Sequence, residues 1–209
     1  MRVTGVQTCA LPISCDVSDE TQVLRFRAEA LDQHGRDHVH LLFNNAGIGG
    51  VVSFVDGDRA DWERTFDICW KGVYLCSRAF VPLLVAADEA HLVNTSSVNG
   101  FWATLGPGST HTAYAAAKFA VKGFSEALIQ DLRANAPHVG VSVVMPGHIG
   151  TDIAVNTGVV MGRNPPEAMS AEELEQRRRQ MVARGLPAEA LDDEQLRELL
   201  VQLGASFRD

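Results

Sequence analysis

The sequence lacks several features that would place a protein in a broad class at once. Its four cysteines, Cys9, Cys15, Cys69 and Cys76, have neither metal-ligand nor disulfide-framework spacing, so a zinc-stabilised or disulfide-stabilised fold is not indicated. No run of 18 or more apolar residues is present, so a transmembrane helix is not expected. The formal charge of −8 disfavours nucleic acids and anionic membranes as partners, because both attract basic surfaces. We therefore expect a cytoplasmic protein.

The remaining composition fits one globular core. The 209 residues are 46% hydrophobic and 21% charged, and they contain no internal repeat or low-complexity tract. Apolar runs typical of strands alternate with helical patterns, which predicts an α/β fold with a parallel, doubly wound sheet. Strands are expected to end near residue 16 and to cover 39–43, 91–95 and 139–144. Helices are expected at 20–34, within 53–88, where Pro82 should bend or end the helix, and at 112–134.

A tyrosine and a lysine suggest acid/base chemistry. Tyr114 and Lys118 stand four apart in an alanine-rich run, so both project from one face of the predicted helix. A nearby ammonium favours phenolate, which predicts a tyrosine with a lowered pKa that exchanges protons near neutral pH. The hydroxyl of Ser97, at a predicted strand end, could then bind the same substrate oxygen. The Tyr-x-x-x-Lys spacing alone is also that of an ordinary surface pair.

Three further motifs directly follow predicted strands. They are Asn44-Asn45-Ala46-Gly47, Asn94-Thr95-Ser96-Ser97 and Pro146-Gly147-His148-Ile149-Gly150-Thr151. Together with Tyr114 and Lys118, they resemble the short-chain dehydrogenase/reductase family over roughly residues 16–151. The resemblance implies a Rossmann-like sheet between two layers of helices. It also implies an NAD(P)-dependent oxidoreductase that interconverts a secondary alcohol and a ketone.

The resemblance also implies the roles of single residues. Tyr114 would be the general acid/base, Lys118 would lower its pKa and hold the nicotinamide ribose, and Ser97 would orient the substrate oxygen. Ser96, Ser109 and Thr110 are weaker candidates, and no metal is expected. Contacts to NAD or NADP are expected from Asp16, Val17, Asn44, Ala46, Gly47, Tyr114, Lys118, Pro146, Gly147, Ile149 and Thr151. For Asp16, a plain turn or capping role is an equal alternative.

The chain departs from the family pattern at two places. Family members usually carry an Asn three residues before a helical Gly, where it serves a proton relay; alignment on Gly72 puts Cys69 there, and a thiol is a poor acceptor. The glycine-rich turn that receives the pyrophosphate is also not found, because Gly47-Ile48-Gly49-Gly50 lacks the G-x-G-x-x-G spacing. The alternative function is therefore a non-catalytic fragment that cannot bind the cofactor.

The sequence suggests three regions. Residues 1–14 resemble translated adapter sequence and are expected to be a non-native leader, 15–155 form the core with the site, and 156–209 form a substrate lid and C-terminal helices. The lid at 157–166 is expected to be a loop, and Phe101, Trp102 and Leu105 suggest an apolar substrate. Ser170 and Glu173 predict a capping box. The resemblance implies that the first βαβ unit and last strand are missing, and that the complete protein is a dimer or tetramer.

Overall fold

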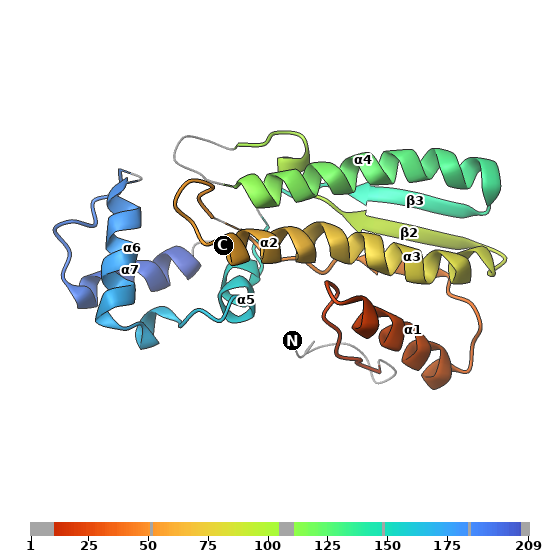
Figure 1. Cartoon of the computed structure of the whole chain (residues 1–209), viewed down its shortest axis with the longest axis horizontal. Coiled ribbons are helices and arrows are strands. Elements are labelled where there is room, and N and C mark those ends of the chain that lie inside the picture. The colour runs from red at the N-terminus through yellow and green to blue at the C-terminus, as the bar shows by residue number, and fades with distance from the viewer. Residues whose placement is uncertain (1–10, 51, 105–110, 148, 184, 206–209) are drawn as a thin grey trace. The chain divides into compact units, whose positions relative to one another are not determined.

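The chain forms two compact units that interleave along the sequence. The computed structural model describes residues 11–50, 52–104, 111–147, 149–183 and 185–205 (Figure 1). One unit, called here the sheet unit, contains the described residues up to 46 together with 70–95 and 121–144. The other, called the site unit, contains 47–69, 96–120 and the described residues from 145 onward. The predicted leader lies almost wholly outside the described residues, and the predicted three-region division stays a prediction.

Three parallel strands form the centre of the sheet unit. They are β1 (Leu41–Asn44), β2 (Ala90–Thr95) and β3 (Val139–Val144), paired in the order β1-β2-β3. Leu42 lies opposite Leu92, which lies opposite Val141. The α/β class and the parallel sheet are thus confirmed. The strand expected to end near residue 16 is not formed by residues 11–16.

The helices of the sheet unit pack on one side of this sheet. They are α1 (Glu20–His34), α3 (Gly72–Val85) and the part of α4 (Thr112–Asn135) that follows residue 120 (Figure 1). Leu84 of α3 and Leu132 of α4 share a buried cluster with Leu92 and Val139. In a second cluster, Val23 of α1 packs with residues of α3, and Leu42 of β1 lies against both clusters.

The opposite side of the sheet is open among the described residues. Side chains alternate along a strand, so Leu41 and Phe43 point away from Leu42, and they are 60% and 62% exposed. On the neighbouring strands, His91 Nε2 lies 2.8 Å from Ser142 Oγ. Of the expected three layers, the described residues therefore supply two.

One continuous helical stretch connects the units in sequence. It consists of α2 (Arg59–Phe66), a π-helix (Asp67–Lys71) and α3. The helix continues past Pro82 and ends at Val85; because Pro82 has no N–H, α3 lacks the bond from this residue to the carbonyl of Arg78. By length and composition, Arg59–Val85 could span a membrane, but 56% of its most apolar window is buried inside the protein, as in a core helix.

The site unit contains mainly short elements. These are α2, the first part of the π-helix, the 3₁₀-helix Val98–Gly100, the start of α4, α5 (Ile153–Val160), the 3₁₀-helix Pro166–Ala168, α6 (Ala171–Ala183) and α7 (Asp193–Ala205). The prediction of a loop at 157–166 is wrong for its first part, because α5 continues to Val160. Thr157 Oγ1 donates to Ile153 O at 2.6 Å, so the hydroxyl of this residue is bonded within the turn of α5 that precedes it.

The C-terminal helices follow their predicted pattern. Ser170 N donates to Glu173 Oε2 at 2.6 Å and Glu173 N to Ser170 Oγ at 3.2 Å, which confirms the capping box. Leu174 and Met181 of α6 pack with Leu196 of α7 in a small core of their own.

Candidate active site

Tyr114 and Lys118 lie in the first turns of α4. Three buried alanines, Ala113, Ala115 and Ala117, favour helix and let this end of α4 pack closely. Lys118 is only 4% exposed, and its Nζ lies 5.5 Å from the centre of the Tyr114 ring. The four-residue spacing therefore gives the shared face that the sequence predicts, with the ammonium over the ring.

Ser97 follows β2 by two residues and begins the 3₁₀-helix. Its Oγ accepts a hydrogen bond from Asn99 N at 3.2 Å, and its side chain is hydrogen-bonded to Tyr114. The structure thus brings Ser97, Tyr114 and Lys118 together within the site unit.

Ser96 has a different position. Its Oγ donates to the backbone oxygen of Lys118 at 2.7 Å, and a Cβ on Gly100 would meet that Oγ at 2.5 Å. Because Gly100 has no side chain, the 3₁₀-helix that follows Ser97 can lie close to α4. The hydrogen bond from Ser96 to Lys118 stabilises this contact. Ser109 and Thr110 lie outside the described residues.

Burial dominates the ionisation of the site. It raises the pKa of Tyr114, while the hydrogen bond from Ser97 opposes the shift and the Cys69 thiol adds to it. Burial also lowers the pKa of Lys118, and Cys69 partly offsets that effect. The expectation that the pKa of Tyr114 is lowered is therefore wrong for this structure, because burial is the largest effect on the phenol and it disfavours the phenolate.

Cys69 belongs to the same surroundings. It is fully buried at the centre of the π-helix, and its Sγ donates to Ile48 O at 3.3 Å. Burial raises the pKa of this thiol and the nearby Lys118 opposes the shift. The alignment identified the position, but no sequence signal indicated a contact between residues 21 apart.

The cofactor residues predicted in the site unit lie around these groups. Val98 N, next to Ser97, donates to Pro146 O at 3.0 Å, and a Cβ on Gly147 would lie 3.8 Å from Val98 Cγ1. A Cβ on Gly47 would lie 3.7 Å from Lys118 Nζ. Among the predicted residues in this unit, those with exposed surface are Gly47, Gly147, Ile149 and Thr151.

The cofactor residues predicted in the sheet unit are mostly engaged within it. Asn44 is buried, and its Nδ2 donates to Ser77 Oγ at 3.0 Å and Asn94 Oδ1 at 2.8 Å. Asp16 Oδ1 accepts from the backbone and the hydroxyl of Ser18, which is the turn role given as its alternative.

Val17 and Ala46 complete the predicted set. A Cβ on Gly72 would lie 2.6 Å from Val17 Cγ2, so Val17 packs against α3 through this glycine. Ala46 is exposed.

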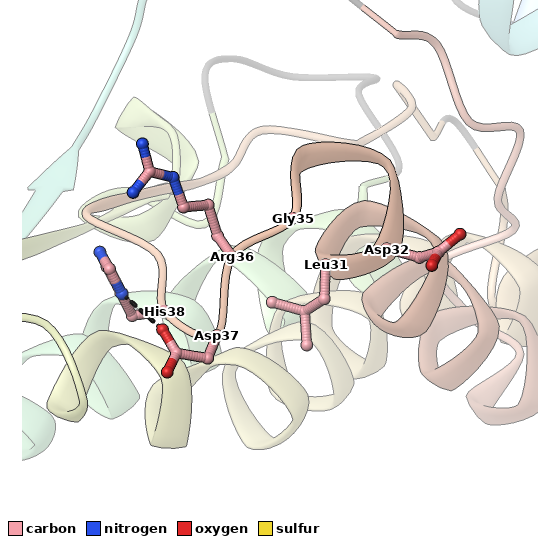
Figure 2. Close-up of a pocket in the computed structure, with 6 residues that line it drawn as sticks. All are labelled: Leu31, Asp32, Gly35, Arg36, Asp37 and His38. Carbon is pink, nitrogen blue, oxygen red and sulfur yellow. Dashed lines mark hydrogen bonds and ion pairs between the residues drawn. The ribbon is translucent and has the colours of Figure 1, made fainter.

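A shallow hollow lies elsewhere in the sheet unit. Figure 2 shows its lining, Leu31, Asp32, Gly35, Arg36, Asp37 and His38, with His38 Nδ1 2.8 Å from Asp37 Oδ1. These residues precede β1, whereas ligands of parallel sheets bind at the carboxyl ends of strands. None of the predicted site residues lines this hollow. Among the described residues, no group of three or more His, Cys, Asp or Glu side chains could hold a metal ion.

The fold and the site together define a class of protein. A parallel α/β sheet with polar motifs directly after its strands is the arrangement in which open α/β sheets bind ligands. The family model described as short chain dehydrogenase matches residues 2–162, and the chain belongs to this family.

Similar proteins agree with this membership. The chain is 38% identical over 149 residues to "Putative oxidoreductase SadH" of Mycobacterium tuberculosis, covering 71% of this chain and 52% of that protein. It is 30% identical over 147 residues to a 3-oxoacyl-[acyl-carrier-protein] reductase of Synechocystis, covering 70% of this chain and 56% of that protein. The chain thus spans about half the length of these curated relatives.

A solved structure is similar over most of the chain. A short chain dehydrogenase/reductase of Burkholderia phymatum, in complex with NAD, has a TM-score of 0.66 and 30% sequence identity. The match covers 95% of this chain and 68% of that one.

Proposed function

We propose that this chain is the catalytic part of an NAD(P)-dependent oxidoreductase that interconverts a secondary alcohol and a ketone. The observation that carries the proposal is the hydrogen bond between the buried Ser97 and the half-buried Tyr114, with Lys118 Nζ 5.5 Å from the tyrosine ring. Family membership and the oxidoreductase and reductase names of its relatives support the same class of reaction.

In this proposal Tyr114 moves the proton at the substrate oxygen. Because its pKa is raised by burial, the phenol is protonated at neutral pH and can donate to the oxygen of a ketone as that oxygen gains charge. Ser97 donates a second hydrogen bond to the same oxygen and so stabilises the developing alkoxide. In the reverse direction, phenolate accepts the alcohol proton, and that direction is favoured by higher pH.

Lys118 supplies positive charge near this reaction. Its burial strengthens the field of the ammonium at the reacting oxygen, because little water screens it. It therefore favours the phenolate that remains after Tyr114 has released its proton. The pKa of Tyr114 is nonetheless raised overall, because burial outweighs the effects that lower it.

The residues of the site unit fit the nicotinamide end of NAD or NADP. The exposed Gly47 and Gly147 have no side chain to block close approach, and the exposed Ile149 backbone and Thr151 hydroxyl offer polar groups for the carboxamide. Lys118 and Tyr114 would hold the ribose. The nicotinamide ring, when bound, takes up or supplies the hydride of the reaction. The known NAD complex of the Burkholderia phymatum relative supports this assignment.

The exposed aromatic residues after Ser97 support an apolar substrate. Phe101 and Trp102 are 54% and 64% exposed, and their ring centres lie 5.9 Å apart. Backbone bonds from both residues to Val98 O, at 2.9 and 3.0 Å, hold them on the Ser97 turn. Leu105, the third residue expected here, lies outside the described residues.

For the complete protein we further propose a cytoplasmic location and a homo-oligomer.

Cofactor titration followed by turnover tests the proposal. NADH and NADPH are added to the full chain while protein fluorescence is followed, and oxidation of the bound nucleotide by an aryl ketone is then measured. Binding with turnover supports the oxidoreductase. No binding at millimolar nucleotide would contradict catalysis by this chain and favour the alternative, a fragment that cannot bind cofactor.

A further inference from the structure

Two cysteines that are far apart in the sequence lie close together in the sheet unit. Cys76 of α3 belongs to the buried cluster that also holds Val23 and Phe80, and Cys15 packs against this cluster from the segment before α1. Both thiols are free in the structure. Burial raises the pKa of the Cys76 thiol to about 12, and the nearby Cys15 thiol adds to the shift.

The contact between Val17 and α3 sets the position of Cys15. A Cβ on Gly72 would lie 2.6 Å from Val17 Cγ2, so the chain passes close to α3 at this glycine. Cys76 stands one turn further along the same face of α3, which is about 6 Å along the helix axis. Two residues of chain span at most about 7 Å, so Cys15 can lie beside the turn of Cys76 while Val17 lies beside Gly72. The packing of Cys15 on the cluster of Cys76 agrees with this placement.

Helix α1 holds the segment around Cys15 from both sides. Arg25 Nη2 donates to Ser14 O at 2.8 Å, and Asp16 N donates to Gln22 Oε1 at 3.0 Å. The residues directly before and after Cys15 are thus fixed. Two groups that are held close together react as if their concentration were very high, so the arrangement favours a reaction between the two thiols.

We propose that Cys15 and Cys76 are a site of reversible oxidation, at which hydrogen peroxide converts the two thiols into a disulfide. In the first step the Cys15 thiolate attacks the peroxide, becomes a sulfenic acid and releases hydroxide, which takes up the thiol proton to form water. In the second step the Cys76 sulfur attacks the sulfenic sulfur, and the sulfenic oxygen leaves as water with the Cys76 proton. The two sulfurs lose two electrons in total, and one peroxide is reduced to two waters.

The surroundings of the two thiols assign their order in the reaction. Burial raises the pKa of Cys15, Arg25 opposes the shift, and Asp16 and Asp19 add to it. Cys15 is half-buried, whereas Cys76 is only 6% exposed. Attack on an oxidant needs both thiolate and access, so Cys15 meets the peroxide first and Cys76 resolves the sulfenic acid. Because both pKa values are raised, the reaction is slow at neutral pH and faster at alkaline pH.

The competing explanation is that the two cysteines only fill the core and do not react with each other. The sequence offers pairs that are closer along the chain, because Cys9 is near Cys15 and Cys69 is near Cys76. Loop closure in an unfolded chain favours such near pairs. Oxidation in concentrated urea should therefore produce the near pairs, whereas oxidation of the folded chain should join Cys15 to Cys76.

Peptide mapping of the full chain distinguishes these bonds. The folded protein is treated with hydrogen peroxide at pH 8.5, the remaining thiols are alkylated, and the chain is digested with trypsin without reduction. Trypsin cuts after Lys71 and so separates Cys69 from Cys76. Cys9→Ser is mapped beside the wild type, because no lysine or arginine separates Cys9 from Cys15.

We expect the pair of Cys15 and Cys76 to exceed any other pair by about tenfold in both proteins, and dithiothreitol to reverse it. Cys69→Ala should leave this pair unchanged, and Cys76→Ala should abolish it. No disulfide in the folded chain, a main pair that includes Cys9 or Cys69, or a bond between two chains would overturn the proposal.

Thermal denaturation gives a second test. The disulfide closes a long loop, so we expect the oxidised wild type to melt about 5 °C higher than the reduced protein. Cys15→Ser should melt at the same temperature before and after peroxide treatment, which controls for oxidation of methionine. A linked chain that does not melt higher would show that the folded structure does not hold the two thiols at bonding distance, and would also overturn the proposal. Both tests use the chain without cofactor, so their results are independent of the proposed function.

Discussion

The two units each bury a cluster of polar side chains, and the clusters differ in kind. In the sheet unit, the cluster consists of neutral groups that bond one another. Asn44 donates to Ser77 and Asn94, Asn94 Nδ2 donates to Ser125 Oγ at 2.9 Å, and Ser125 Oγ donates to Val121 O at 2.7 Å. Such a network stabilises a core, because none of the buried side-chain nitrogen and oxygen atoms of these residues is left without a hydrogen-bond partner.

In the site unit, the buried groups are ionisable. Burial shifts the pKa of Tyr114 upward and those of Lys118 and Cys69 in the directions that favour their neutral forms. A buried ammonium costs stability, so this cluster is expected to be retained for chemistry while the other is retained for the fold. The comparison teaches that burial of polar residues alone does not identify a site; the ability to ionise separates the two clusters.

The largest expected effect concerns Tyr114. Replacing Tyr114 with Phe should lower turnover by about 10³-fold, because the proton donor is lost while the ring still fills its place. Tyr74→Phe is the matched control, since Tyr74 is the other tyrosine of the sequence and is partly exposed. Steady-state kinetics measure turnover, and circular dichroism shows whether each variant keeps its fold. Retained turnover in Tyr114→Phe would refute the assigned role.

A change in the neutral cluster should act on stability instead. Asn94→Leu leaves Asn44 and Ser125 each short of a partner, so the free energy of unfolding should fall by about 3 kcal/mol. Asn135→Leu, at an exposed position, should change it by less than about 0.5 kcal/mol. Urea denaturation measures both. A loss below 1 kcal/mol for Asn94→Leu would remove the distinction between the clusters.

The ionisable cluster should respond in the opposite direction. Lys118→Met should raise the free energy of unfolding by about 2 kcal/mol at pH 7, because the buried ammonium is removed, while turnover is lost. Lys122→Met, which breaks a surface ion pair with Glu126, should change it by about 0.5 kcal/mol or less.

The pH dependence of the Lys118 effect has a definite sign. The pKa of Lys118 is lower in the folded protein than in the unfolded chain, so between these two values the unfolded chain binds more protons. The free energy of unfolding of the wild type therefore rises with pH between these two pKa values. The amount by which Lys118→Met exceeds the wild type in free energy of unfolding should shrink over the same range. Denaturation at pH 7 and pH 9.5 tests this trend; an advantage that grows with pH would contradict it.

The smallest expected effects concern two glycines, one in each unit. A Cβ on Gly50 would meet Thr65 Cγ2 at 2.5 Å, whereas a Cβ on Gly123 of α4 would have no neighbour within 4 Å. Gly50→Ala should therefore cost about 1 kcal/mol, and Gly123→Ala should add about 0.5 kcal/mol by stiffening the unfolded chain. Thermal denaturation measures the melting temperatures of the two variants. Equal shifts in melting temperature would show that the loop containing Gly50 can relax to accept the methyl group.

The sequence predicted those parts of the fold that depend on neighbouring residues. Helix α1 begins after Asp19 and ends at Gly35, whose φ is +57°, because capping residues act within one turn. The strand predicted at 139–144 is the observed β3. The shared face of Tyr114 and Lys118 also follows from local spacing.

The parts that failed depend on residues far apart in the chain. The raised pKa of Tyr114 comes from burial, which no four-residue pattern reports. Asn44 has an inward bond to Asn94, 50 residues away, which the resemblance to cofactor-binding turns did not reveal. The hydrogen bond from Cys69 to Ile48 likewise joins residues that are 21 apart, and no local pattern predicted it.

The open side of the sheet has a practical consequence for anyone who handles this chain. Leu41 and Phe43 place a strip of hydrocarbon directly in water on a rigid, pleated surface. Surfaces of this kind adhere to one another, to plastic and to hydrophobic dyes. Concentrated solutions of the chain should therefore become turbid on warming well before the sheet itself melts, and mild detergent should delay that turbidity.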